Sequence, residues 1–462
     1  MPQADNITAH DLELLRSRVA AAVLLPGDPG LSEEAGGFNL AVAHRPVAVV
    51  AATNPQDVAT AVSWAAERRI PVAVQATGHG AVPADGALLI TTRRMRRVTV
   101  DAQRGVARVE AGAQWRDVID AAAVYALAPL CGSSSGVGVT GYTLGGGIGL
   151  LSREHGFAAD HVLSVDLVTA DGRLRHVTAD TEPDLFWAVR GGQANFGIAT
   201  AIEIQLFPVT KLYGGGLYFP GSSAADVLHA YRAWAPTLPE SASSSVALLR
   251  LPPLEHLPEP LRGQFVVHLR FSYNGPAETG EALIAPMRAA GQPVLGHVGL
   301  LPFQAVDAVH QDPKDPMPVW HHGAALRTLD AETVDALVAA AGPDRDIPLL
   351  MVELRQLGGA LSRPASPPNA VAGREDAYSV HLVGPLVPGL DEVVPAVGTG
   401  ILEALAPWTA GTALLNFLGA TTPKELAAVW SADVHARLLD IKEKVDPDNL
   451  FRVGHALGSD GS

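Results

Sequence analysis

The segment from Gly132 to Gly149 limits how this 462-residue chain can fold more than any other part of it. Glycines and serines dominate the segment, and residues 136–141 form a literal G-x-G-x-x-G motif. A Rossmann nucleotide site needs a strand directly before such a motif and a helix directly after it. Here a poor strand precedes the motif, and the residues that follow hold too much glycine for a stable helix. The motif is therefore only weak evidence for a Rossmann nucleotide-binding turn.

Apolar residues are interleaved with these glycines, which argues against a flexible surface loop. They are Val137, Val139, Leu144, Ile148 and Leu150. Glycines let a backbone approach a bound group closely, and successive backbone N–H groups suit an anion. We therefore expect a buried glycine loop whose amides face an anionic or polar ligand.

The composition is that of a globular protein without covalent cross-links. Hydrophobic residues make up 48% of the chain and charged residues 18%, which disfavours disorder. The single cysteine, Cys131, excludes an intrachain disulfide and a Cys-based zinc site. The net charge of −15 argues against a nucleic-acid partner. Residues 1–6 lack a basic region and no apolar run is long enough to span a membrane, so we expect a cytoplasmic protein with no membrane partner.

Helix-like and strand-like patterns alternate along the chain and predict an α+β protein. Asn54 before Pro55 predicts a helix start, and Asp171-Gly172 predicts a hairpin turn. The predicted helices cover residues 10–23, 55–65, 114–126, 224–234, 331–341, 423–430 and 433–445. The predicted strands cover residues 47–51, 70–75, 87–91, 98–100, 106–110, 162–170, 173–179, 199–206, 265–271, 348–354, 377–382 and 414–418. The strands of the middle part suit an antiparallel sheet.

His79 stands between two glycines directly after the strand predicted over residues 70–75. A histidine in that setting has an accessible ring. Taken alone, it is more often a turn residue that bonds to the backbone. A ligand held by the glycine loop needs a second wall, however, and His79 is the candidate for it.

Several motifs, taken together, resemble one family. In chain order they are Arg45-Pro46, Val74 to His79, Gly132 to Gly141, Leu144 to Gly149, Val165 to Gly172, Asp184 to Gly192, Asn195 to Gly197, Leu415 to Gly419 and Lys442 to Phe451. Their order and spacing resemble the FAD-linked oxidases of the vanillyl-alcohol oxidase/p-cresol methylhydroxylase superfamily, and most of all the berberine-bridge-enzyme-like group. The resemblance covers the chain from about Arg45 to Leu457.

The resemblance implies a two-domain FAD-binding fold of the p-cresol methylhydroxylase type. Residues 1–209 and 410–462 would build the FAD-binding domain. Residues 210–409 would form an inserted substrate domain, an antiparallel sheet covered by helices.

The resemblance also implies the residues that hold FAD. His79 falls on the histidine that the family bonds covalently to the flavin C8 methyl carbon. The adenosine diphosphate portion would lie along two loops, with Gly197 and Ile198 near the adenine. The loop residues are Gln75, Ala76, Thr77, Gly78, Gly80, Gly132, Ser133, Ser134, Gly138 and Gly141.

Two departures from the family pattern change the expectation. Many members carry a second covalent link through a cysteine of the glycine loop, and that position holds Ser134 here. We therefore predict a single link through His79 and interpret Cys131 as a small buried residue. Plant members use a glutamate base where this chain has Arg363, so their mechanism does not transfer.

Three residues are candidates for the chemistry. Tyr142 follows the glycine loop and would orient the substrate, or act as a base if its pKa fell; packing is the alternative. Glu353 lies in an apolar run, where burial would raise the pKa of its carboxyl; a structural pair with Arg355 is the alternative. Asn416 resembles the family's asparagine near the flavin, and satisfaction of a buried amide is the competing account.

The substrate cavity is expected to be lined by polar and aromatic residues of the middle part. They are Trp320, His322, Arg355, Tyr378 and His381. Although His321 and His322 are adjacent, their side chains would diverge on a strand, so no metal site is expected.

The resemblance implies two-electron oxidation of a small organic substrate. Hydride would pass to flavin N5, and O2 would reoxidise the flavin to give H2O2. A dehydrogenase or oxidative cyclase with little O2 reactivity is the alternative, and a non-catalytic flavin-binding protein is a more remote one. The sequence does not identify the substrate or the oligomeric state.

Overall fold

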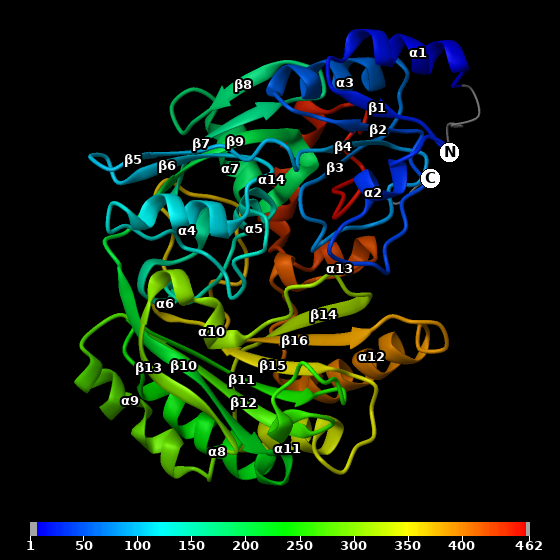
Figure 1. Cartoon of the computed structure of the whole chain (residues 1–462). Coiled ribbons are helices and arrows are strands. Elements are labelled where there is room, and N and C mark those ends of the chain that lie inside the picture. Colours follow the sequence, from blue (N-terminus) through cyan, green and yellow to red (C-terminus); the bar gives the residue numbers. More distant parts are fainter. Residues whose placement is uncertain (1–6, 459–462) are drawn as a thin grey trace.

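The chain folds into two lobes, shown one above the other in Figure 1. The structure is a computed structural model and describes residues 7–458. Helices take up 35% and strands 24% of it, which confirms the α+β prediction. The upper lobe holds the first part of the chain and its C-terminal segment, and the lower lobe holds the middle part. The domain limits given above stay a prediction.

The first sheet of the upper lobe has four strands in the order β1-β2-β4-β3. They are β1 (Ala22–Leu24), β2 (Ala48–Ala51), β4 (Leu88–Thr91) and β3 (Val72–Gln75). β2, β4 and β3 run parallel, and β2 and β4 are buried throughout, as parallel strands commonly are. The crossover from β2 to β3 is α3 (Pro55–Glu67). Its predicted start is confirmed, because the Asn54 side chain accepts hydrogen bonds from the N–H groups of Gln56 and Asp57.

The helix predicted over residues 10–23 is wrong in its second half. α1 spans Ala9–Arg18, and the chain then extends into β1, which pairs antiparallel with β2. Val19 and Val23, which supplied the helical spacing, are buried in this arrangement. Pairing with an already buried strand therefore decides the local structure, and tertiary context overrides the helical spacing.

The second sheet of the upper lobe has five antiparallel strands in the order β5-β6-β9-β7-β8. They are β5 (Val98–Asp101), β6 (Val106–Glu110), β9 (Ile198–Gln205), β7 (Val162–Val168) and β8 (Leu174–Val177). The predicted hairpin of β7 and β8 is confirmed, and Gly172 takes φ +71° in its turn. The helices α4 (Trp115–Ala123), α5 (Val139–Leu144) and α7 (Pro183–Gly192) share a core with this sheet.

The lower lobe is built on one antiparallel sheet of seven strands in the order β13-β10-β12-β11-β15-β16-β14. The strands are β13 (Leu295–Pro302), β10 (Lys211–Pro220), β12 (Phe265–Tyr273), β11 (Ala242–Arg250), β15 (Met351–Gln356), β16 (Tyr378–Pro385) and β14 (Val319–Leu326). The antiparallel sheet predicted for this part of the chain is thus present.

One face of the seven-stranded sheet is apolar and carries four helices, which lie away from the upper lobe in Figure 1. The helices are α8 (Ala224–Trp234), α9 (Ala277–Ala289), α11 (Ala331–Ala341) and α12 (Val393–Leu405). Leu269, Leu354 and Val380 are examples of the side chains in their shared core. Because side chains alternate along a strand, the residues between these positions face the other way, toward the upper lobe.

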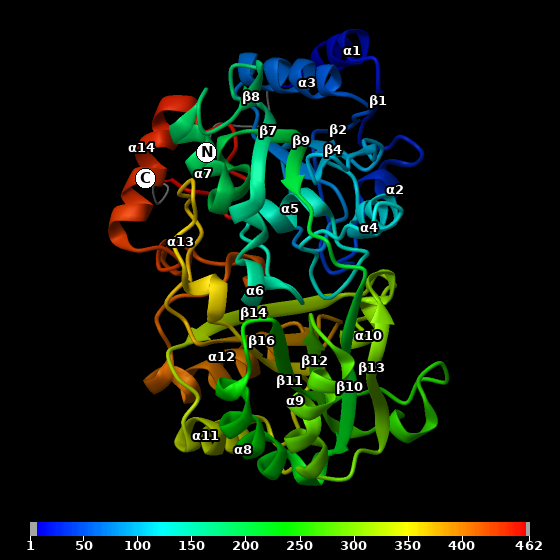
Figure 2. The same cartoon turned by 90° about the vertical axis from the view of Figure 1, so that its left-hand side faces the viewer.

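Two short helices lie where the lobes meet, α6 (Ser152–His155) and α10 (Asp307–His310) (Figure 2). The C-terminal segment returns to the upper lobe through α13 (Pro423–Ala427) and α14 (Ala432–Val445). α14 packs on α7, and the N–H of Val72 in β3 donates to the carbonyl of Leu450 at 3.0 Å.

The strand predicted over residues 414–418 is wrong, because residues 415–417 form a turn of 3-10 helix. Leu415 and Leu418 belong to one hydrophobic cluster, and Leu414 and Phe417 contact another. Each cluster thus takes two residues that are three positions apart, and such residues lie on the same side of a helical turn. In a strand, residues three positions apart would point to opposite faces.

None of the helices within residues 7–458 combines the length and the apolar character that a membrane span needs.

Candidate active site

His79 lies in the turn that follows β3. Gly78 in this turn has φ +75°, and a Cβ added to it would lie 2.7 Å from the Cα of Gly37. Position 78 therefore needs glycine both because its φ is positive and because Gly37 approaches so closely. The side chain of Gln75 fixes the turn from below, because its Nε2 donates to the carbonyl of Ala35 at 2.8 Å and its Oε1 lies 3.0 Å from Nε2 of His44.

The His79 ring is held in one orientation. It stacks on Phe38 with 4.0 Å between ring centroids, and Nδ1 lies 2.9 Å from Oγ1 of Thr77. Nε2 has no hydrogen-bond partner among the described residues. Burial lowers the pKa of His79 to about 4, so the imidazole is neutral near pH 7 and keeps a lone pair on one ring nitrogen.

A cavity of about 690 Å³ opens beside His79. Its lining joins the His79 turn to the glycine loop, with Ala76, Thr77 and His79 on one side and Ser134 to Gly136 on the other. Four basic side chains also line it: Arg93, Arg96, Arg116 and Lys314. The structure thus brings together the two loops that were predicted to hold a cofactor.

Some predicted cofactor residues do not line this cavity. They are Gln75, Gly78, Gly80, Gly132, Ser133, Gly138, Gly141, Gly197 and Ile198. Gly138 and Gly132 shape it indirectly. A Cβ on Gly138 would crowd Oγ1 of Thr77 at 3.2 Å, and one on Gly132 would lie 2.8 Å from the ring of Tyr142. Gly197 packs on Val168 in the second sheet, and Ile198 is buried at the start of β9.

The glycine segment holds a helix that composition alone did not predict. α5 begins directly after Gly138 and ends at Leu144, so residues 142–144 are helical although residues 142–149 were expected to hold too much glycine for a stable helix. Val139 and Leu144 are buried in the core of the upper lobe, so tertiary packing stabilises this short helix. As expected, no strand precedes the motif within the described residues; Ala128 makes only an isolated bridge to Phe207.

The donors around the glycine segment fit a large polar cofactor. The hydroxyls of Thr140, Tyr142 and Thr143 and the Nε of Arg93 are buried, and none has a hydrogen-bond partner in the described part of the chain. Buried polar groups are rarely left unpaired in native proteins. Unpaired hydroxyls, arginines and a glycine-lined backbone form the donor set that a phosphate-bearing group with polar rings would satisfy.

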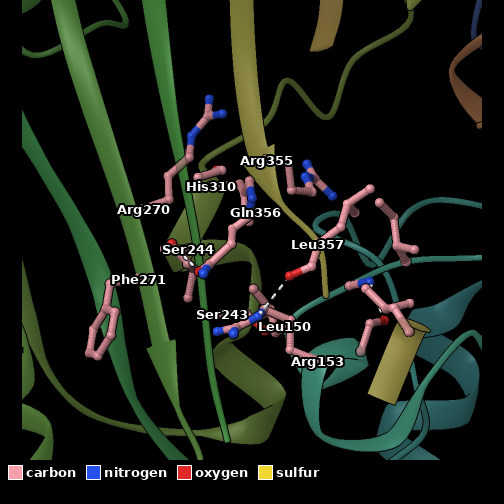
Figure 3. Close-up of a pocket in the computed structure, with 16 residues that line it drawn as sticks. Leu150, Arg153, Ser243, Ser244, Arg270, Phe271, His310, Arg355, Gln356 and Leu357 are labelled. Atoms are coloured by element: carbon pink, nitrogen blue, oxygen red, sulfur yellow. Dashed lines mark hydrogen bonds between the residues drawn. The ribbon is translucent and has the colours of Figure 1, made fainter. Parts of the chain in front are cut away.

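The polar face of the seven-stranded sheet carries two neighbouring rows of side chains. In antiparallel register Arg270, Ser245 and Arg355 lie side by side across β12, β11 and β15. In the next row His268, Ala247, Glu353 and His381 lie across β12, β11, β15 and β16. Residues that pair across strands share one face of the sheet. Both rows therefore face the upper lobe, and Figure 3 shows Arg270, His310 and Arg355 close together there.

Glu353 does not have the raised pKa that the sequence suggested. Burial does act to raise the pKa of this carboxyl, but the charges of Arg355 and Arg270 outweigh it and hold the pKa well below its usual range. Arg270 donates to Glu353 at 2.7 Å and Arg355 at 3.0 Å. The Glu353–Arg355 pair given as the alternative is present, and at neutral pH Glu353 is a fixed negative charge instead of an acid.

Tyr142 is also unsuited to act as a base. Its hydroxyl is buried, which raises the pKa of the phenol well above 10. The ring packs edge-on against Trp115, with 5.3 Å between centroids. Tyr142 is therefore a hydrogen-bond donor at neutral pH, and the packing given as its alternative is observed as well.

Asn416 has its amide satisfied within the protein. Its Nδ2 donates to the carbonyl of Tyr142 at 2.8 Å, and its Oδ1 accepts from Nε2 of Gln193 at 3.4 Å. Both the nitrogen and the oxygen of the Asn416 amide therefore have partners within the protein, as the alternative of a satisfied buried amide states. Through these bonds the turn of Leu415–Phe417 is fastened to α5.

Three of the predicted substrate-lining residues are on the wrong face of the sheet. Tyr378 packs into the core beneath the sheet, where it contacts Tyr231. Trp320 contacts Gly398 of α12, and His322 stacks beside Trp320 on the same face. Tyr378 precedes His381 by three residues, an odd spacing that puts the two on opposite faces of a strand.

His321, which precedes His322 in β14, does reach the polar face of the seven-stranded sheet. Its ring lies 5.6 Å from that of His381, which in turn stacks on Phe417 at 4.5 Å. His381 and Arg355 are thus the predicted substrate residues that the structure places on the side of the upper lobe.

Sequence reasoning missed four residues of this face: His268, Arg270, Ser245 and His310. The run Phe265 to Tyr273 carries polar residues at 268, 270 and 272, and this alternation in a buried strand was the available signal. His310 gave no such signal, because it reaches the site on a four-residue helix from another part of the chain.

The histidines of this face make stability sensitive to acid. Burial lowers the pKa of His381 to about 3 and that of His321 to about 4, from 6.5 in each case. The unfolded chain therefore takes up these protons first as the pH falls. The free energy of unfolding should drop between about pH 6.5 and pH 4, by about 1.4 kcal/mol per pH unit for each histidine kept neutral.

Urea unfolding at a series of pH values checks this prediction. Substitution His381→Gln should flatten the acid-side decline by about 1.4 kcal/mol per pH unit. The exposed His256→Gln serves as the control. An unchanged slope in His381→Gln would contradict the assignment.

Cys131 lies outside the cavity that holds His79. Its side chain is buried, which raises the pKa of the thiol to about 12. A thiol in that state is unreactive at neutral pH. Ser134, in contrast, lines the cavity.

Three comparisons with known proteins agree with this geometry. Residues 46–178 match a family model described as an FAD binding domain. The chain is 26% identical to (R)-6-hydroxynicotine oxidase of Paenarthrobacter nicotinovorans, over 96% of this chain and 98% of that protein. It is also 26% identical to the uncharacterized FAD-linked oxidoreductase YgaK of Bacillus subtilis, with the same coverage of both chains.

Solved structures give the same picture. 6-Hydroxy-D-nicotine oxidase of Arthrobacter nicotinovorans superposes with a TM-score of 0.82 at 25% identity, over 95% of this chain and 98% of that one. The BBE-like 1 protein of Physcomitrella patens superposes with a TM-score of 0.84 at 18% identity, over 98% of this chain and 100% of that one. The latter likeness concerns the fold.

Proposed function

We propose that this chain, an FAD-linked oxidoreductase of the vanillyl-alcohol oxidase/p-cresol methylhydroxylase superfamily, is an oxidase that bonds FAD covalently to His79. Its substrate is a small organic molecule, and O2 is the electron acceptor. The observation that carries the proposal is the cavity in which a neutral His79 faces Ser134 and the glycine loop.

His79 suits a covalent link because its ring is oriented and uncharged. Phe38 and Thr77 fix the ring, and in the tautomer whose Nδ1–H donates to Thr77 the unpaired Nε2 keeps its lone pair available. A second link is not expected, because Ser134 takes the position next to the cavity and the Cys131 thiol is buried and protonated.

The His79 turn and the glycine loop would hold FAD, which would supply two-electron redox chemistry between the substrate and O2, with H2O2 as the product of O2. The residues of this chain supply binding and orientation. The glycine loop and the His79 turn offer backbone N–H groups to the phosphates, and Tyr142 presents an O–H donor. The polar face of the lower sheet, with Arg270 and Arg355, meets the substrate from the opposite side.

The alternative to an oxidase is a dehydrogenase or oxidative cyclase that reacts poorly with O2. The two are separated without knowledge of the substrate. The purified protein is reduced photochemically under anaerobic conditions and mixed with air-saturated buffer in a stopped-flow instrument. An oxidase should regain its absorbance about tenfold or more faster than free reduced FAD. Reoxidation no faster than that of free FAD would rule the oxidase out.

A further inference from the structure

A second, smaller cavity lies between the lower sheet and the glycine segment of the upper lobe (Figure 3). Its volume is about 20 Å³, which is room for one water or for the end of a ligand. Its polar lining includes Arg153, Arg270, Arg355, His310 and Ser245 beside three further serines and Gln356, and Ile148 to Leu150 and Leu361 supply much of the rest.

The positive charges around this cavity outnumber the negative ones. The side chains of Arg270 and Arg355 are 3% and 13% exposed, and both pair with the single carboxylate of Glu353. Arg153 is buried as well, and among residues 7–458 its guanidinium donates to backbone carbonyls alone, among them Ala242 at 2.6 Å and Leu357 at 3.0 Å. Three arginines thus line the cavity and no carboxylate does, while Glu353 beside it is the acid that pairs with Arg270 and Arg355.

The remaining groups that face the cavity do not restore the balance. His310 is buried without charge, since burial and the two neighbouring arginines hold its pKa well below 6.5. His268 is neutral because burial and the charge of Arg270 hold its pKa well below 6.5, and its Nδ1 accepts from Arg270 at 3.0 Å. Asp312, on the loop after α10, is half-buried and acts on Arg355 through its charge without forming an ion pair in the described part of the chain, and Glu240 acts on Arg153 in the same way.

Several polar atoms at the cavity also await a partner. The Nε of Arg355, the Oγ of Ser245 and both ring nitrogens of His310 are buried without a hydrogen bond to any described residue. His310 is 6% exposed and lines the cavity directly. Uncompensated buried charge and unpaired buried donors are both costly, and an anionic acceptor would satisfy both.

We propose that this cavity is the subsite for an anionic oxygen group of the substrate, a carboxylate or an ionised acidic hydroxyl. The inference rests on the proposed function, because it takes the polar face of the lower sheet to be the substrate side of the cofactor site. Arg355 and Arg270 hold the charge, and Ser245 contributes a hydrogen bond. The size of the cavity admits the charged end only, so the rest of the substrate lies outside it. A cationic amine is excluded by the surrounding guanidiniums.

Isothermal titration calorimetry of the purified protein tests the proposal with small aromatic probes. Benzoate, 4-nitrophenolate, benzamide and benzylamine are titrated at a pH where the first two are anions and benzylamine is a cation. At least one anion should bind about tenfold or more tighter than benzamide, and benzylamine should not bind. The better of the two anions then distinguishes a carboxylate from an ionised hydroxyl. Equal affinity for benzamide, or binding of benzylamine, would overturn the proposal.

Two variants with opposite expected effects strengthen the test. Arg355→Met should reduce anion affinity about tenfold or more. Glu353→Gln removes the negative charge that pairs with both Arg270 and Arg355 and should increase the anion affinity, whereas a merely structural role for Glu353 predicts a loss. Arg104→Met is the matched control, because Arg104 is exposed and pairs with Glu203 in the second sheet of the upper lobe, away from the cavity. If Arg355→Met does not fold, the probe series on the unmodified protein and on Glu353→Gln still tests whether the cavity binds an anion.

The result is independent of the oxidase proposal. The absorbance and O2 reaction of the same preparation are recorded separately. A yellow protein that reoxidises rapidly but shows no anion preference would refute the subsite and leave the oxidase standing. Anion preference in a protein that reacts slowly with O2 would support the subsite and refute the oxidase.

Discussion

Replacement His79→Ala should abolish covalent flavin. When the unmodified protein is denatured and run on a gel soaked in acid, its band should fluoresce under ultraviolet light, and the His79→Ala band should be dark. The reason is that His79 places an uncharged imidazole at the cavity wall, and the other groups of that wall, such as Ser134 and Thr77, are much poorer nucleophiles. Non-covalent FAD should still bind, because the glycine loop is untouched.

Cys131→Ser is the control for this experiment. The thiol is buried outside the cavity, so the band of this variant should fluoresce as brightly as that of the unmodified protein. A dark Cys131→Ser band would show a cysteinyl link and overturn the single-link prediction. A fluorescent His79→Ala band would overturn the histidyl link itself.

Replacement Lys442→Met should strongly destabilise the upper lobe. Lys442 is buried in α14, and its ammonium donates to Asp446 at 2.6 Å and to the carbonyls of Asn195 at 2.8 Å and Phe451 at 2.9 Å. Asp446 in turn accepts from the N–H groups of Leu450 and Phe451, which fixes the chain that pairs with β3. Methionine would leave a buried carboxylate without its cation, at a cost of about 3–5 kcal/mol.

Urea unfolding followed by tryptophan fluorescence measures this loss as a lower midpoint. Lys444→Met, two residues along the same helix and exposed, is the matched control and should leave the midpoint nearly unchanged. If the two variants unfolded at the same urea concentration, the buried ion pair would not have the role assigned to it.

Much of the fold was accessible from the sequence because its signals are local. The Asn54 cap, the Asp171-Gly172 turn and the amphipathic helices α8 and α11 report on their own immediate neighbours. The wrong predictions lie where contacts with residues far away in the sequence determine the local structure. Residues 22–24 became a strand because β2 was available to pair with, and residues 415–417 became a helical turn because their side chains enter two separate cores.

The candidate site divides in the same way. The His79 turn and part of the glycine loop meet at one cavity as predicted, because both are defined by glycine motifs. The pKa of Glu353 was misjudged because Arg270, 83 residues earlier in the chain, joins it only through the order of the strands. Tyr378, Trp320 and His322 were misplaced because the face of a strand depends on its register, and His310 reaches the site on a helix from elsewhere.

The visible absorption spectrum of the native protein is the most direct test of the central claim. A yellow protein with flavin absorbance that remains attached after denaturation is the result we expect. A protein that stays colourless even after incubation with added FAD would contradict the assignment of the cavity, and the roles given to His79 and the glycine loop would fall with it.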